Sequence, residues 1–592
     1  MYMMNQELEK LLSALQAEHD YAKKEHTRIE NLPFPERVSL GFAFPPLPLK
    51  SIDEQRILLR IPKNTHIHDG IEPGDTVSLF PRSAEELAVE GLCADIDSHS
   101  VEIRSKEAVQ APWIQKGDIC VQKRFDERSY LLQENGLQKA IAHESSLKNA
   151  LLGDWTLEIA MDAPNRSLLN TDQSIAIETF LRANSLSLIH GPPGTGKTHT
   201  IAVLCAELIS SKQRLWVLAD SNAATDNLCQ AIAALNIDVL RLGSSFRISA
   251  KTWHLSLQHR QETHPHALAL KKLEKQIRTS SGKEKGLLVK EKKHIERSMR
   301  SEIVENAHII VSTLGTMHKE APHLPSPALA IIDEASQVID PSIWTLVPYI
   351  PKLLLVGDPH QLGPVVLSQH PRLQQTLLKT KMNMQKAPML TVQHRMHQCI
   401  HRLVQTVYGE TYIPHPSVAN RTLCDDNTIT PNSLTKTQVL WIDTTGAEEG
   451  EERDSITHSL YNPTEIDWVC QAYHALKHSQ VQNIGIVTPY SAQVQRLREE
   501  LPDAEVNTVT SFQGAERDVI ICSFVRSNWE GELGFVADPE RLTVSLTRAK
   551  KLLIAIGDTS LLSQNQRFAE LFSLLEEEQQ IISIWDENPF VH

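Results

Sequence analysis

The feature that most constrains this chain is the glycine-rich stretch at residues 191–198, which reads Gly-Pro-Pro-Gly-Thr-Gly-Lys-Thr. An apolar run at 185–189 predicts a short buried strand before it, and the apolar pattern at 200–204 predicts a helix after it. Strand, glycine-rich turn and helix are the context of a P-loop, where backbone N–H groups and the positive helix end converge on phosphate. The stretch therefore predicts a nucleoside triphosphate site rather than a chance loop rich in glycine and proline.

Four residues supply the chemistry expected at such a site. Lys197 would contact the β- and γ-phosphates, and Thr198 would bind Mg²⁺ through its hydroxyl. Asp333 and Glu334 follow an apolar run at 329–332, so Asp333 would hold Mg²⁺ through water and Glu334 would act as the general base. An Asp-Glu pair alone is common, but this one follows a predicted strand about 135 residues beyond a P-loop. Because the sequence shows no second acceptor site, a hydrolase is favoured over a kinase.

Length and composition predict three or four structural units, since 592 residues with 41% hydrophobic content are ordinary for globular protein. No apolar run has the length of a membrane span, so we expect no membrane partner. The eight cysteines form no Cys-x-x-Cys pair, which argues against a zinc module and fits a reducing cytoplasm. The net charge of −14 does not decide about nucleic acid, because thirteen Lys/Arg against six Asp/Glu at 251–304 form a local basic region.

The first 152 residues alternate between helical and strand patterns. Short alternating apolar segments between 38 and 121 predict a small antiparallel barrel with a structural or accessory role, although a nucleic-acid-binding role stays open. A helical pattern at about 134–152 would return the chain beside an earlier helix. That earlier helix, ending near residue 29, is predicted by leucines at helical spacing: Leu8, Leu11, Leu12 and Leu15.

Two α/β patterns follow, and each predicts a parallel sheet covered by helices on both faces. The second, from about residue 389, contains no second P-loop. The basic region interrupts the first pattern and is predicted as an insertion of about two helices, which is either a nucleic-acid contact or a solvated hairpin. The strand candidates are 215–218, 238–240, 309–311, 329–332 and 353–356 in the first pattern, and 438–442, 484–487, 519–522 and 552–556 in the second.

Two arginines in the second pattern, Arg395 and Arg548, are candidate arginine fingers. An arginine facing the nucleotide stabilises the charge that develops on the γ-phosphate. A single arginine is more often part of a surface or structural ion pair, so this prediction depends on the sequence words around the two residues.

Nine such words occur in order, and together they resemble those of superfamily 1 helicases of the 5′-to-3′ branch. The closest type is the up-frameshift and immunoglobulin-mu-binding-protein group, whose motif II reads Asp-Glu-Ala-Ser-Gln, as residues 333–337 do here. The resemblance spans about 169–557. The words lie at 191–198, 221–228, 312–316, 333–337, 357–364, 393–396, 488–490, 511–516 and 546–550.

The resemblance implies an α/β fold of two RecA-like P-loop domains in tandem, with ATP in the cleft and single-stranded nucleic acid across the top. It also implies an N-terminal helical stalk that carries a small β-barrel, and a helical insertion in the first RecA-like domain. The expected divisions are 1–35 (stalk helix), 36–130 (accessory β-barrel), 131–164 (return stalk helix), 165–375 (first RecA-like domain, with the basic insertion at 250–304) and 376–592 (second RecA-like domain).

The resemblance also assigns residues. Gln173 matches the position that reads adenine, Gln361 matches the γ-phosphate sensor, and Gly514 and Glu516 match nucleotide contacts of the second domain. The implied catalytic residues are Lys197, Glu334, Gln361, Arg395 and Arg548, and the implied metal ligands are Thr198 and Asp333. Further nucleotide contacts are Gly191, Pro192, Pro193, Gly194, Thr195, Gly196, His199 and His394. Nucleic-acid contacts, mostly to phosphate and sugar, are Ser221, Asn222, Thr313, Pro489, Tyr490, Thr508 and Thr510.

Four positions depart from the family pattern. His394 stands where a tyrosine usually packs on adenine, and Thr510 replaces a common aspartate. Glu540 and Thr543 replace a usual arginine and asparagine. None of the four is a hydrolysis residue, so the resemblance implies a competent ATPase, and the departures bear on base preference and on coupling to nucleic acid.

The expected function is an ATP-dependent 5′-to-3′ helicase or translocase on single-stranded nucleic acid, DNA being slightly favoured over RNA, with ATP and Mg²⁺ as cofactors. One alternative is an RNA or ribonucleoprotein remodelling ATPase with little unwinding. An alternative of another class is an ATP-gated, non-catalytic nucleic-acid clamp or scaffold. We expect a monomer in the cytoplasm, or in the nucleoid or nucleus if DNA is the substrate; the sequence does not reveal which proteins it binds.

Overall fold

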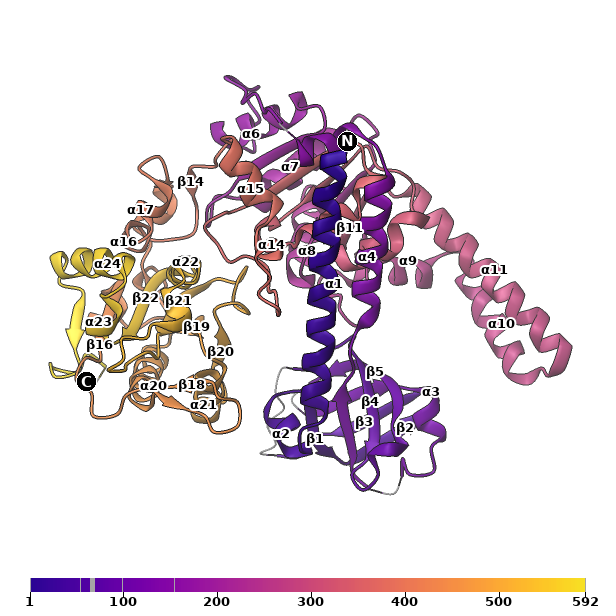
Figure 1. Ribbon diagram of the computed structural model, residues 1–592, viewed down its shortest axis with the longest axis horizontal. Helices are drawn as coiled ribbons and strands as arrows, with labels where there is room; N and C mark the ends of the chain where they lie inside the picture. Colours follow the sequence, from indigo (N-terminus) through magenta and orange to yellow (C-terminus); the bar gives the residue numbers. More distant parts are fainter. Residues whose placement is uncertain are drawn as a thin grey trace.

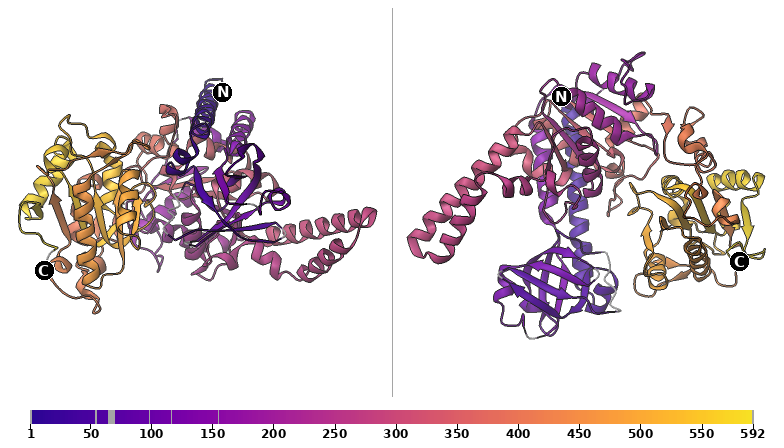
Figure 2. Two further views of the ribbon diagram at one scale, coloured as in Figure 1. Left: turned by 90° about the horizontal axis from the view of Figure 1, so that it is seen from below. Right: turned by 180° about the vertical axis from the view of Figure 1, so that it is seen from behind.

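The computed structural model describes residues 2–53, 55–63, 70–97, 99–115, 117–153 and 155–590. Figure 1 shows two α/β bodies side by side, a separate antiparallel sheet at the end of a helical stem, and a helical hairpin that projects from the first body. Figure 2 shows the same parts from below and from behind. None of the described helices is long and apolar enough to cross a membrane.

The first α/β body is built on a six-stranded sheet in which all neighbouring strands are parallel. One face is covered by α6 (Thr171–Arg182), α7 (Lys197–Ile209) and α8 (Asn222–Ala233). Helices from the N-terminal region help to cover the other face. The predicted parallel sheet with two covered faces is therefore confirmed. Its strand order is β10 (Leu240–Leu242), β11 (Ile309–Thr313), β9 (Leu215–Ala219), β12 (Leu329–Ile332), β13 (Leu353–Gly357) and β8 (Leu186–His190).

The second α/β body has its own six-stranded parallel sheet. All four predicted strands are present. The order is β20 (Glu505–Thr508), β19 (Ile484–Thr488), β21 (Arg517–Ser523), β22 (Ala549–Gly557), β16 (Val439–Asp443) and β23 (Ile581–Ser583). One face carries α20 (Pro463–His478) and α21 (Ser491–Glu500), and the other carries α16 (Gln398–Arg402), α17 (Gln405–Tyr408), α22 (Pro539–Leu546) and α24 (Gln566–Glu577).

The stem consists of α1 (Tyr2–Glu30) packed beside α4 (Glu127–Ala142). Leu8 and Leu11 are buried in the core of the first α/β body, because helical spacing places them on one face of α1. The predicted helix ending near residue 29 is confirmed. The predicted helical stretch at 134–152 begins earlier than expected and is broken, because Ser145 leaves the helical conformation and its side chain caps α5 (Ser146–Leu152).

The sheet at the far end of the stem is antiparallel throughout, as the alternating sequence pattern predicts. Among the described residues, β1 and β2 are the two edge strands and no pairing joins them, so the sheet is open between these two strands. The accessory role of this sheet stays a prediction. Its order is β1 (Ala43–Leu47), β7 (Ile119–Lys123), β4 (Thr76–Pro81), β5 (Val89–Ile96), β6 (Ser100–Arg104), β3 (Arg56–Arg60) and β2 (Leu49–Asp53).

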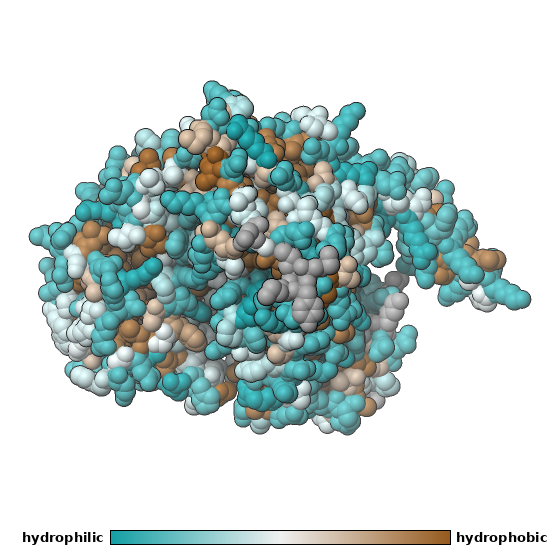
Figure 3. All heavy atoms as spheres, turned by 45° about the horizontal axis from the view of Figure 1, so that its top comes forward, coloured by the Kyte–Doolittle hydropathy of each residue, from teal (hydrophilic) through white to brown (hydrophobic). Residues whose placement is uncertain are grey.

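The basic insertion forms the projecting hairpin of α10 (Ala267–Thr279) and α11 (Gly282–Asn306), preceded by the short α9 (Leu257–Thr263). The expectation of about two helices agrees with this arrangement. Figure 3 shows the projecting arm as mostly hydrophilic, with a few hydrophobic side chains between. Most of its side chains are exposed.

The chain passes from the first body to the second between residues 390 and 396. Leu377 and Leu378, on α15 (Leu377–Met384), pack in the core of the first body, and Leu390 packs on its other face. Met396 lies in the core of the second body. The division at residue 375 stays a prediction about domains, but the packing groups 377–390 with the first sheet.

Candidate nucleotide site between the two sheets

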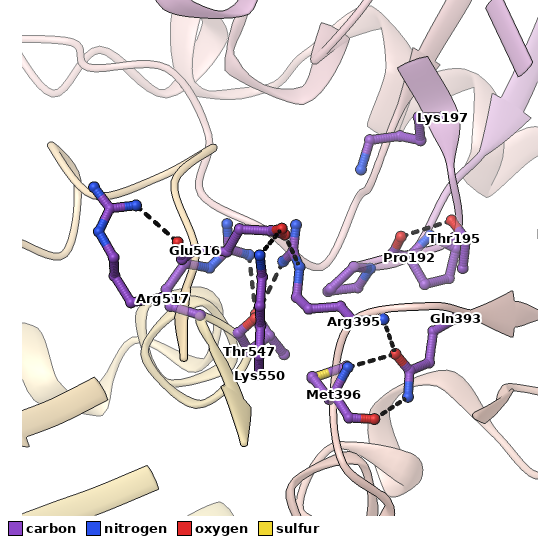
Figure 4. Close-up of polar contacts among 12 residues, drawn as sticks. Pro192, Thr195, Lys197, Gln393, Arg395, Met396, Glu516, Arg517, Thr547 and Lys550 are labelled. Atoms are coloured by element: carbon purple, nitrogen blue, oxygen red, sulfur yellow. Dashed lines mark hydrogen bonds and ion pairs between the residues drawn. The ribbon is translucent and has the colours of Figure 1, made fainter. Parts of the chain in front are cut away.

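The P-loop connects β8 to α7 as predicted. Gly194 and Gly196 have φ values of +73° and +79°, a left-handed conformation that favours glycine. Lys197 donates from Nζ to the Gly191 carbonyl over 2.9 Å and lies 3.7 Å from Glu334 Oε1. Thr195 donates to the Pro192 carbonyl over 2.7 Å, as Figure 4 shows. The lysine ammonium thus lies between the glycine-rich loop and the acidic pair.

The acidic pair follows β12 directly. Thr198 Oγ1 donates to Asp333 Oδ2 over 3.2 Å. Burial and the neighbouring Glu334 raise the pKa of the Asp333 carboxyl to about 7. A divalent cation held there would favour the charged carboxylate, and a hydroxyl beside a carboxylate matches the oxygen ligands that Mg²⁺ prefers. The predicted metal ligands therefore fit the ion.

Glu334 has the geometry of a base, because one carboxylate oxygen faces Lys197 and the other is without a hydrogen-bond donor among the described residues. Its backbone is left-handed, with φ at 53°, and its N–H donates to Asp333 Oδ1 over 2.9 Å. Its Oε2 atom is buried and has no hydrogen-bond partner among the described residues. A buried oxygen without a donor is costly unless another molecule, such as a water, fills that position.

A cleft of about 480 Å³ lies between the two bodies and collects most of the predicted nucleotide residues. It brings together the whole predicted catalytic and metal set: Lys197, Thr198, Asp333, Glu334, Gln361, Arg395 and Arg548. Its lining also includes Pro193, Gly194, Thr195, Gly196, His394, Gly514 and Glu516. Residues far apart in sequence thus meet at one site.

Four predicted nucleotide residues are not part of the cleft lining: Gln173, Gly191, Pro192 and His199. The Gln173 amide is occupied locally, since its oxygen accepts from the Asn170 N–H over 3.1 Å and its nitrogen donates to the Thr195 carbonyl over 3.0 Å. His199 pairs with the Leu168 carbonyl over 2.8 Å. The Gln173 side chain therefore binds the P-loop backbone at Thr195. Its contact with adenine stays a prediction.

Arg395 is held in place by the second body (Figure 4). Its Nε donates to Glu516 over 2.6 Å, and Nη1 donates to the Thr547 carbonyl over 3.1 Å. Lys550 lies 2.7 Å from the other oxygen of Glu516. Although burial favours the neutral acid, Arg395 and Lys550 hold the pKa of Glu516 down to about 2. Glu516 is thus a fixed anion that orients the candidate arginine finger.

Arg548 is a desolvated cation beside it. Its side chain is 2% exposed, and Nε donates to the Val544 carbonyl over 3.1 Å. Burial, followed by the charge of Arg395, lowers the pKa of Arg548 to about 9, so it stays positive near neutral pH. Phosphate oxygens in the cleft would compensate this buried charge.

His394 is already stacked on another ring. Its centroid lies 4.4 Å from that of His415, and its backbone N–H donates to the Gly194 carbonyl over 2.8 Å. His394 lines the cleft, and its contact with a base stays a prediction. His415 was not predicted.

The predicted nucleic-acid residues lie where parallel strands end. Ser221 and Asn222 follow β9, Thr313 ends β11, Pro489 and Tyr490 follow β19, and Thr508 ends β20, with Thr510 exposed just beyond. They therefore lie at the carboxyl edges of the two sheets, where α/β proteins bind ligands. The structure does not gather them into one pocket; Ser221 lines the nucleotide cleft, and Thr508 lines a separate hollow of about 340 Å³ beside residues 39–41 and 70.

Sequence reasoning missed several residues of the cleft. Gln337 and Gln513 line it and belong to words that were recognised, so their polarity within those words was an available signal. Asp220 also lines the cleft, and burial raises its pKa. Tyr408 and Tyr412 touch nucleotide-binding loops from the second body, and the sequence carries no signal for those contacts.

Two family models, each described as an AAA domain, match residues 168–369 in two overlapping segments and residues 373–560. DNA-binding protein SMUBP-2 of Mus musculus is 30% identical, over 84% of this chain and 54% of that protein. DNA polymerase alpha-associated DNA helicase A of Schizosaccharomyces pombe is 28% identical, over 87% of this chain and 86% of that protein. The regulator of nonsense transcripts 1 homolog of Neurospora crassa is 28% identical, over 84% of this chain and 47% of that protein.

The chain thus spans about half the length of SMUBP-2 and most of the yeast helicase. Among solved structures, an arterivirus nonstructural protein 10 helicase matches with a TM-score of 0.41 at 13% identity, over 91% of this chain and 82% of that one. The family models and the relatives agree with the ordered words of the sequence. The chain belongs to the superfamily 1 helicases, a family of nucleic-acid-dependent ATPases, in the group of the immunoglobulin-mu-binding-protein and up-frameshift helicases.

Proposed function

We propose that this chain is an ATP-driven motor that moves 5′ to 3′ along single-stranded nucleic acid and separates a duplex ahead of it. One observation carries the proposal: a single cleft, lined by both α/β bodies, holds the complete predicted hydrolysis set. The direction is taken from the resemblance to the 5′-to-3′ branch. A monomeric state and a cytoplasmic, nucleoid or nuclear location stay predictions.

The chemistry follows from the positions of these side chains. Lys197 and the P-loop amides hold the phosphates, and the unpartnered Oε2 of Glu334 accepts a proton from the attacking water. Mg²⁺ between Thr198 and Asp333 would neutralise charge on the phosphate oxygens. Arg395 and Arg548 reach the same cleft from the second body and stabilise charge on the γ-phosphate.

Movement follows from sharing the site between two bodies. Binding of ATP by both bodies draws the cleft closed, and loss of the γ-phosphate contacts of Gln361, Arg395 and Arg548 lets it open. Residues at the carboxyl edges of both sheets contact the nucleic-acid strand, and they convert closing and opening of the cleft into steps along it.

DNA is the favoured substrate, because two of the relatives are named a DNA helicase and a DNA-binding protein. An RNA or ribonucleoprotein remodeller is the second candidate, favoured by the relative named a regulator of nonsense transcripts. A non-catalytic clamp is disfavoured, because the residues needed for hydrolysis are all present in the cleft.

The test is ATP turnover by the purified protein alone, with single-stranded DNA and with single-stranded RNA. We expect stimulation by DNA, and loss of turnover with strand binding retained in Lys197→Ala; Lys436→Ala, at an exposed lysine outside the cleft, is the matched control. Duplexes with a 5′ or a 3′ tail then give the direction. If Lys197→Ala hydrolyses ATP as fast as wild type, the assignment of the ATP site is wrong. If neither single-stranded DNA nor single-stranded RNA changes the turnover, the proposed motor function is wrong.

A further inference from the structure

Two buried tyrosines of the second body end on nucleotide-binding loops of the first. Tyr408 is the last residue of α17, and Tyr412 precedes β15 (Ile413–Pro414); they are 6% and 0% exposed. The Tyr408 hydroxyl donates to Asp358 Oδ2 over 2.7 Å. The Tyr412 hydroxyl donates to the Pro193 carbonyl over 2.7 Å. Neither ring is part of the lining of the ATP cleft.

Asp358 begins the loop that presents Gln361. It is 0% exposed, and its Oδ1 atom faces His190 Nε2 at 3.2 Å and accepts from the His360 N–H over 3.0 Å. The backbone N–H of Gln361 donates to the Asp358 carbonyl over 3.2 Å. A buried carboxylate with several donors has one preferred orientation. The position of Gln361 therefore depends on Asp358, and the Tyr408 hydroxyl is one of the groups that fix Asp358.

Pro193 belongs to the P-loop itself. The next carbonyl, of Gly194, accepts from the His394 N–H over 2.8 Å, so two successive P-loop carbonyls accept bonds from the 394–412 segment. The ring centroids of Tyr408 and Tyr412 are 5.0 Å apart, which makes the two contacts parts of one packed unit. Burial raises the pKa of both phenols, so both stay protonated donors at any working pH.

We propose that Tyr408 and Tyr412 are positioning residues that tie the γ-phosphate-sensing loop and the P-loop to the second body. Tyr408 acts on the hydrolysis step through Asp358 and Gln361, and Tyr412 acts on nucleotide affinity through the backbone of Pro193. The inference rests on the proposed function, since it assigns parts of that same ATP site. The competing account is that both rings only fill the core.

Phenylalanine substitutions separate the two accounts, because they keep each ring and remove only the hydroxyl. We expect Tyr408→Phe to lower kcat for ATP by on the order of tenfold, the effect of losing one hydrogen bond to a buried charge, with KM within about twofold. We expect Tyr412→Phe to raise both KM and the Kd of a fluorescent ATP analogue by about threefold to tenfold with kcat retained. Tyr473→Phe, at a buried tyrosine on α20, is the matched control with both parameters unchanged.

Wild-type kcat, KM and Kd in both variants would overturn the proposal. It would also be overturned if either variant lost kcat, nucleotide affinity and the wild-type thermal unfolding midpoint together, because that pattern belongs to a core-filling role. If the wild-type protein hydrolyses no ATP with any polymer, the proposed function falls by itself. The Kd of Tyr412→Phe for the fluorescent analogue then decides the inference: weaker binding supports it and unchanged binding overturns it.

Discussion

At the scale of single residues, the most unusual group outside the cleft is Glu465 on α20. It is completely buried, and its Oε2 accepts from Ser523 Oγ over 2.6 Å and from the Val525 N–H over 2.8 Å. Its Oε1 atom is without a hydrogen-bond partner among the described residues. Burial raises the pKa of Glu465 from 4.5 to about 8, so the folded chain holds it as the neutral acid at neutral pH.

This residue predicts a pH dependence of stability. Below pH 4.5 both states carry the proton; between pH 4.5 and 8 the unfolded chain releases it and the folded chain retains it, so stability falls as pH rises. Glu465→Gln cannot ionise. Its thermal unfolding midpoint should therefore rise relative to that of wild type as pH increases from 4.5 to 8, by about 2–4 °C for each kcal/mol of unfolding free energy that wild type loses. Midpoints that stay parallel from pH 4.5 to 8, as expected for the exposed control Glu577→Gln, would contradict the assignment.

The predicted site residues that the structure brings into the cleft belong to local sequence words. Lys197, Asp333 and Gln361 each belong to such a word, and each lines the cleft. The sequence did not predict the contacts that Gln173 and Glu516 make. The Gln173 side chain is part of a helix cap, and Glu516 pairs with Arg395 and Lys550. Such contacts depend on neighbours that only the folded chain brings together.

At the scale of elements, α15 of the first body meets α22 of the second through an ion pair between Lys379 and Glu540. A hollow of about 520 Å³ beside it is also lined by His360, Lys386 and Arg567. An arginine at position 540, the usual family residue, would add a cation to this basic wall. Glu540, one of the departures from the family pattern, instead supplies a negative charge that pairs with Lys379 across the two bodies.

The pair predicts a charge-swap result. Both side chains are partly exposed, 40% for Lys379 and 24% for Glu540, so the pair contributes about 0.5–1 kcal/mol. Glu540→Arg and Lys379→Glu should each raise KM for ATP by about twofold to fivefold through weaker closure, and the double variant should recover most of that loss. Steady-state kinetics on the four proteins measures the coupling. Additive losses in the double variant would rule out a direct interaction.

Element prediction succeeded where an apolar pattern was strong and failed where it was weak. β20 contains Val506 as its one buried residue, so it shows no continuous apolar run, and β23 is a short, half-buried edge strand with two isoleucines. The break between α4 and α5 arises at Ser145, whose cap lies inside an otherwise helical pattern. Hydrophobic periodicity reports burial, and it does not report caps or edges.

At the scale of the whole molecule, the sequence words predicted an α/β fold of two RecA-like bodies in tandem, but they did not predict the contacts that join the two bodies. The two α/β bodies meet at a cleft, the stem helps to cover one face of the first sheet, and the basic hairpin projects away (Figure 1). Long-range contacts fix this arrangement, for example the hydrogen bond between Tyr412 and Pro193, which no local pattern encodes. The central claim at this scale is that both bodies complete one hydrolysis site.

ATP turnover by Arg548→Ala in the presence of single-stranded DNA tests that claim. Arg548 enters the cleft from the second body, whereas the P-loop and the acidic pair belong to the first. The shared site predicts that kcat falls by about 10³-fold or more, while the thermal midpoint and the affinity for a fluorescent ATP analogue stay close to those of Arg541→Ala, a control at a partly exposed arginine of α22. Turnover by Arg548→Ala equal to that of Arg541→Ala would contradict the shared site and confine hydrolysis to the first body.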